Sequence, residues 1–119
     1  MKHRTAVAFV VASALSASVW ALSPVLTGHA EPWDADGPYY LFALAIAGAI
    51  SGCLFPKPLW THYMAAVVGQ AAFEVAFLDV GPLFVLGLLF LAGSSLVFFA
   101  AAVLGGFVRV RCAGDADAA

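Results

Sequence analysis

Gln70 and Glu74 are the strongest chemical feature of this sequence, because both lie inside a long apolar run. Residues four apart share one face of a helix, so the amide and the carboxyl can touch. A carboxyl inside a membrane helix marks a relay, a solute pathway or a structural partner. Three interpretations of Glu74 stay open: a structural tie to the outer loop, a proton- or solute-handling carboxylate, or a lipid-facing side chain that reaches the interface.

The Gln70 amide needs hydrogen-bond partners on neighbouring helices if its run crosses a membrane. We expect Ser16, Ser18 or Ser94 to supply them. His62 lies near the inner end of the same run, where we expect it to be solvated or stacked rather than to act as a ligand.

A second polar group interrupts the apolar sequence at residues 28–40, GHAEPWDADGPYY. Its imidazole and carboxylates are able to chelate a divalent cation. Its two prolines and its Asp-Gly-Pro turn instead favour a hairpin that leads back into the next helix. We interpret the segment as a structural hairpin, with a partner-docking surface and a metal or catalytic site as alternatives. The candidate interaction residues are His29, Glu31, Trp33 and Asp34.

The composition places the chain in lipid. Of its 119 residues 64% are hydrophobic and 10% charged, with a mean hydropathy of +1.00, whereas about 25% of residues are charged in a soluble domain. Five basic residues and a net charge of −2 argue against nucleic-acid binding. The two cysteines are isolated in sequence, and no motif of a hydrolase, a P-loop or a zinc enzyme is present. We therefore expect no catalysis, no cofactor and no bound metal.

Four apolar runs have the length that a membrane helix needs, which is about 20 residues for about 30 Å of hydrocarbon. They are residues 5–26, 39–55, 59–78 and 83–108, and the segments EPWDADGP, PKP and DVGP separate them. The sequence thus predicts an all-α, antiparallel bundle of four transmembrane helices in one domain, residues 1–112, and a short disordered cytoplasmic tail, residues 113–119. The first run also resembles a cleavable signal peptide, but it exceeds the roughly 7 to 15 residues of a signal core, so we interpret it as a retained helix.

The charged residues predict the orientation, because basic residues favour the cytoplasmic ends of membrane spans. All five basic residues fall on one predicted side: Lys2, Arg4, Lys57, Arg109 and Arg111. Four acids fall on the other: Glu31, Asp34, Asp36 and Asp79. Both termini are thus predicted to be cytoplasmic, in a bacterial-type inner (plasma) membrane. Six aromatic residues lie at the predicted boundaries, where we expect headgroup anchors: Trp20, Trp33, Tyr39, Tyr40, Trp60 and Tyr63.

Small residues at regular spacing predict close helix packing, since the hydrophobic effect does not drive association in lipid. Gly48 and Gly52 lie four apart in the second run, and Gly69 and Gly93 lie in the third and fourth. We interpret these four glycines as contacts within one chain, with a homodimer face as the alternative.

Two functions fit these observations. The first is a small polytopic inner-membrane protein with a non-catalytic, accessory or protein-interaction role. The second is a homo-oligomeric transporter or channel for a small solute or protons, with Gln70 and Glu74 along its path. The expected partners are the lipid bilayer and either a membrane protein or further copies of the chain.

Overall fold

Four helices make up the fold in the computed structural model, which describes residues 2–28, 38–56, 59–78, 81–82 and 84–118. They are α1 (Lys2–Thr27), α2 (Tyr39–Leu54), α3 (Leu59–Phe77) and α4 (Phe84–Ala118), and no strand occurs in these ranges. The predicted all-α fold is confirmed for this part of the chain. Seven of the eight helix ends lie within three residues of the apolar runs, because prolines and glycines flank those runs.

The eighth end differs. Helix α4 continues through Ala118, beyond the end of the fourth apolar run at Val108. No proline follows Pro82 in the sequence, and alanines recur at 113, 116 and 118. Alanine is the strongest helix former, so nothing in this segment forces the helix to stop.

Helix α1 ends at a glycine in the left-handed backbone conformation. Gly28 has a φ of 79°, and its N–H donates to the Pro24 carbonyl at 3.1 Å. A glycine adopts this conformation without the steric cost that a Cβ brings. The chain therefore turns away from α1 directly after Thr27.

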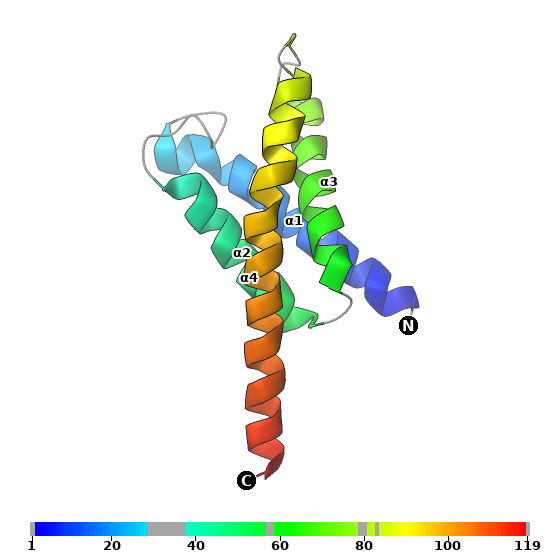
Figure 1. Cartoon of the computed structure of the whole chain (residues 1–119). Helices are drawn as coiled ribbons and strands as arrows, with labels where there is room; N and C mark the ends of the chain where they lie inside the picture. Colours follow the sequence, from blue (N-terminus) through cyan, green and yellow to red (C-terminus); the bar gives the residue numbers. More distant parts are fainter. Residues whose placement is uncertain (1, 29–37, 57–58, 79–80, 83, 119) are drawn as a thin grey trace.

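The helices associate as two pairs. Helix α1 packs mainly on α3, and α2 packs mainly on α4, whereas the consecutive helices α2 and α3 have little contact. Figure 1 shows that α1 and α3 run in one direction and α2 and α4 in the other. Successive helices alternate in direction, yet each most extensive contact joins two parallel helices. Both termini lie toward the lower end in Figure 1, here called the terminal end.

Glycines bring the backbones together in both pairs. A Cβ built on Gly48 or Gly52 of α2 would lie less than 3.0 Å from the carbonyl oxygen of Phe98 or Ala102 of α4. In the other pair, a Cβ on Gly69 of α3 would lie less than 3.0 Å from Ser13 of α1. Each of these positions therefore requires a residue without a side chain.

Gly93 differs from the expected packing. It is exposed on α4, and a Cβ there would have no neighbouring atom within 4 Å. Gly105 occupies the equivalent position at the α2 contact instead, since its Cβ would lie less than 3.0 Å from the Ala49 carbonyl oxygen. Sequence spacing alone does not tell which face of α4 turns toward α2.

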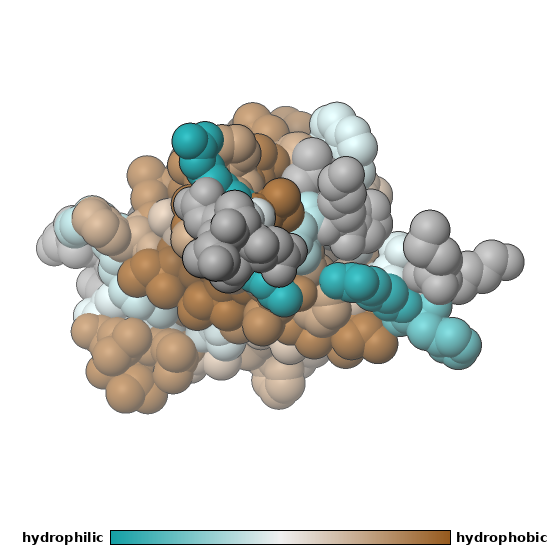
Figure 2. Space-filling view, turned by 90° about the horizontal axis from the view of Figure 1, so that it is seen from below, coloured by the Kyte–Doolittle hydropathy of each residue, from teal (hydrophilic) through white to brown (hydrophobic). Residues whose placement is uncertain are grey.

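Large apolar side chains cover the outside of all four helices, with Val10, Phe42, Phe77 and Leu89 among the exposed ones. Figure 2 shows the terminal end, where hydrophilic groups stand out from a mostly brown, hydrophobic surface. Two helices are long and apolar enough to cross a membrane, over His3–Thr27 and Phe84–Gly114, and only 28% and 17% of their apolar windows are buried. Helix α2 is apolar but has only 16 residues, so the bundle of four spans stays a prediction.

Replacing Gly52 with alanine tests the contact between α2 and α4. We expect Gly52→Ala to lower the free energy of unfolding by about 2 kcal/mol, because the new methyl group overlaps the backbone of α4. Gly93→Ala is the matched control, and it should leave the free energy of unfolding unchanged or raise it by up to about 1 kcal/mol, because its methyl group meets no neighbour and alanine is the better helix former. The measurement is unfolding in detergent micelles followed by circular dichroism. Equal stabilities of the two variants would contradict the contact.

Candidate functional site

The side-chain amide of Gln70 lies at the centre of a hydrogen-bond network that involves all four helices. Its Oε1 accepts from Trp20 Nε1 of α1 at 2.9 Å and from the Tyr40 hydroxyl of α2 at 2.6 Å. Its Nε2 donates to the Ala66 carbonyl of α3 at 3.1 Å and to Ser95 Oγ of α4 at 2.9 Å. An amide has two N–H donors and two acceptor lone pairs, so its hydrogen-bonding capacity is fully used. We call Trp20, Tyr40, Gln70 and Ser95 the central network.

Water is excluded from this network. Trp20, Gln70 and Ser95 are 0% exposed and Tyr40 is 5% exposed. The Trp20 and Tyr40 rings meet edge to face, with their centroids 6.3 Å apart. The Ser95 hydroxyl donates to the Leu91 carbonyl at 2.9 Å, so the chain of hydrogen bonds ends on the backbone of α4.

Gln70 bonds to Trp20, Tyr40 and Ser95 in place of the three serines that we expected. Ser16 and Ser18 donate to the carbonyls of Ser13 and Leu15 in their own helix, and Ser16 also reaches the Ala65 carbonyl of α3 at 3.4 Å. Serine hydroxyls commonly return to the preceding turn of a helix. The longer side chains of Trp20 and Tyr40 donate to the Gln70 amide instead.

Trp20 and Tyr40 correct the sequence interpretation, which assigned both to the headgroup layer. Position in the run suggested an interfacial anchor, but the faces of α1 and α2 that carry these residues turn toward α3. The sequence does contain a signal for this contact. Tryptophan and tyrosine each combine a large apolar body with one hydrogen-bond donor, and the amide oxygen of Gln70 needs such donors.

Glu74 lies one turn beyond Gln70 on α3 and is 5% exposed. Its carboxyl interacts electrostatically with the Tyr40 hydroxyl. Gln70 and Glu74 thus both face the interior of the bundle, next to Tyr40. The carboxyl extends the polar interior from the central network toward the end opposite the termini.

A second polar contact lies nearer the terminal end, at His62. This histidine is 0% exposed, although we expected it to be solvated or stacked. Its Nε2 lies 2.7 Å from the Phe55 carbonyl, and its Nδ1 lies 2.7 Å from the Ser51 hydroxyl. Because a carbonyl only accepts, the neutral ring carries its proton on Nε2 and Ser51 donates to Nδ1. The imidazole therefore joins the start of α3 to the end of α2.

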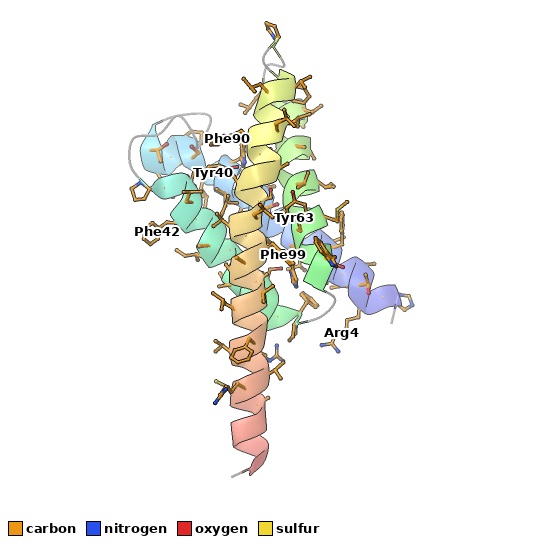
Figure 3. All side chains as sticks on the ribbon, viewed as in Figure 1. Arg4, Tyr40, Phe42, Tyr63, Phe90 and Phe99 are labelled. Carbon is orange, nitrogen blue, oxygen red and sulfur yellow. The ribbon has the colours of Figure 1, made fainter. Side chains whose placement is uncertain are left out.

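Two aromatic residues lie at the start of α3, the end of the helix where we expected headgroup anchors. Trp60 is 70% exposed and its ring centroid lies 5.1 Å from that of Phe99. The Tyr63 hydroxyl donates a hydrogen bond to the Ala92 carbonyl at 2.9 Å. Figure 3 shows Tyr63 and Phe99 close together between α3 and α4, while Phe42 points outward from α2.

The candidate residues of the outer loop do not contribute to this description. His29, Glu31, Trp33 and Asp34, the expected interaction residues of the outer loop, lie outside the described residues. Among the residues that are described, no group of three His, Cys, Asp or Glu side chains is placed to hold a metal ion. Comparison with protein-family models, with curated proteins and with solved structures finds no match. The site is therefore interpreted from its own chemistry.

Replacing Gln70 with leucine should destabilise the whole bundle. The change leaves the Trp20 N–H and the Tyr40 hydroxyl buried without their acceptor, and we expect a loss of about 2 kcal/mol in the free energy of unfolding. Tyr40→Phe removes only one of these bonds and should cost about 0.6 kcal/mol. Met64→Leu on the exposed face of α3 is the control. A Gln70→Leu variant as stable as this control would contradict the structural role of the amide.

Proposed function

We propose that the protein is an integral membrane protein that crosses the bilayer four times and has a non-catalytic, accessory role. The observation that carries the proposal is the distribution of polarity. Exposed apolar side chains occur on all four helices, while polar side chains such as Ser51, His62, Gln70 and Ser95 are fully buried. A protein in water places these classes the other way round, whereas a protein in lipid must satisfy polar groups internally.

The location of the described arginines supports the proposed orientation. Arg4, Arg109 and Arg111 are exposed, and the helix ends that carry them lie toward the terminal end (Figures 1 and 3). The guanidinium of Arg109 also donates to the Cys53 carbonyl near the end of α2. Basic residues favour the cytoplasmic side of a bacterial inner membrane, so we propose that both termini face the cytoplasm.

Cysteine labelling tests this orientation with a residue that the chain already has. Cys112 is exposed near the C-terminus. In a Cys53→Ala background, an impermeant maleimide should leave Cys112 unlabelled in intact spheroplasts and label it in inside-out vesicles. For the opposite end, Gly81→Cys in a chain without its two natural cysteines should give the reverse pattern, because Gly81 is exposed with no atom near its Cβ position. Labelling of Cys112 from outside would overturn the orientation.

The saturated amide of Gln70 supports an accessory role over transport. A solute path needs polar groups that exchange partners with the solute, and this amide directs its whole hydrogen-bonding capacity at other parts of the chain. The burial of Glu74, at 5% exposure, is the observation that favours the second candidate, a homo-oligomeric transporter or channel for protons or a small solute.

Flux through liposomes separates the two candidates. We expect liposomes with the reconstituted protein to release an imposed proton gradient no faster than empty liposomes, because the polar groups around Gln70 are engaged within the chain. The readout is a pH-sensitive dye trapped inside. A wild-type flux that Glu74→Gln abolishes, in a variant with unchanged circular dichroism, would establish transport and contradict the accessory role.

The accessory role also makes a positive prediction in the native membrane. A photo-cross-linking amino acid at Trp33, in the proposed interaction segment, should give one discrete adduct with another protein. The same probe at Phe42, which points outward from α2 (Figure 3), serves as the control and should give no discrete protein adduct. An adduct of the chain with itself would instead support the homo-oligomeric alternative.

A further inference from the structure

The four helices have unequal lengths, and this difference bears on the lipid that surrounds them. Helix α2 has 16 residues, which corresponds to about 24 Å. Helix α1 has 26 residues, or about 39 Å, and the apolar part of α4 from Phe84 to Val108 measures about 37 Å. An average bilayer has a hydrocarbon core of about 30 Å. Two helices are thus longer than the core, and α2 is shorter.

The exposed apolar surface of α2 is also short along the helix axis. Its large exposed side chains are Leu41, Phe42, Ile46, Ile50 and Leu54. The first and the last are separated by about 20 Å along the helix axis. Acyl chains that contact this face therefore meet apolar side chains over less than the thickness of an average core.

Contacts fix both ends of α2. At the start, the Tyr39 hydroxyl donates to the Val19 carbonyl of α1 at 2.6 Å. At the end, His62 binds the Phe55 carbonyl and Arg109 binds the Cys53 carbonyl. Pro38 precedes the helix and Pro56 follows it, so α2 does not extend by a further turn at either end.

The packing on α4 fixes the height of α2 as well. Gly48 faces Phe98 and Gly52 faces Ala102, while Gly105 faces Ala49, so these contacts hold α2 against the middle of α4. Figure 1 shows the paired ends of α3 and α4 above the start of α2.

A long helix and a short helix respond differently to the same bilayer. A helix longer than the hydrocarbon core tilts, whereas a shorter one leaves the lipid to thin around it. We infer that the surface of α2 fits a bilayer thinner than average, and that the lipid partner of this protein is a phospholipid with short acyl chains. This inference rests on the proposed membrane function.

Reconstitution into phosphatidylcholine vesicles of increasing chain length tests the inference. The series is myristoleoyl, palmitoleoyl, oleoyl, eicosenoyl and erucoyl phosphatidylcholine, and the readout is thermal unfolding of the full chain by circular dichroism. We expect the highest Tm in the two shortest lipids and a fall of about 5 °C toward the longest. A maximum in the two longest lipids, or a Tm that is constant across the series, would overturn the inference.

A variant with a longer α2 assigns the effect to this helix. Inserting Leu-Leu-Ala-Leu between Pro38 and Tyr39 adds about 6 Å before the first packed residue and leaves the register on α4 unchanged. The Tm maximum should move to longer lipids by at least one member of the series. The same insertion after Gly114 is the control, with no expected movement. An α2 variant whose maximum stays with the shortest lipids would show that another helix sets the preference.

The two proposals fail in different ways. If alkaline carbonate releases the protein from membranes, the proposed membrane function fails and the inference about α2 fails with it. If the protein stays in the membrane and its Tm ignores chain length, only the inference about α2 fails.

Discussion

The side-chain amide of Gln70 is the polar group on which the arrangement of the helices depends. Three of its four hydrogen bonds leave α3, one to each of the other helices. Buried polar groups gain from a partner only when the geometry is good, and they lose heavily when it is absent. Sliding any one helix along its axis would break a bond to this amide. The central network therefore specifies the register of the bundle more than it adds to its stability.

Glycine contacts and hydrogen bonds make different contributions to the arrangement of the helices. Gly48, Gly52 and Gly69 allow the helices of each pair to approach until backbone atoms touch, which provides close van der Waals contact between them. Such contact is tolerant of small rotations. The amide of Gln70, and the imidazole of His62 between Ser51 and Phe55, then select one of the arrangements that close packing permits.

The sequence predicts some of these features well and others poorly, for physical reasons. Run lengths and prolines predict the helices, because apolar length and chain breaking are local properties. The interior position of Gln70 and Glu74 also follows from their polarity. Which helix meets which is not local: Trp20 and Tyr40 have the composition of interfacial anchors, and only the rotation of α1 and α2 about their axes turns them toward Gln70. The rotation of α4 likewise decides the roles of two of its glycines: Gly93 faces outward and Gly105 faces α2.

The pairing of α1 with α3 and of α2 with α4 has a consequence for biosynthesis. The first two helices leave the ribosome before either of their main partners exists, and they contact each other less extensively than they contact those partners. Until α3 emerges, the donors of Trp20 and Tyr40 lack the acceptor that they share, and until α4 emerges Gln70 lacks Ser95. Folding thus cannot proceed by stacking one finished hairpin on another. The native contacts of α2 and of Gln70 are complete only after α4 has emerged.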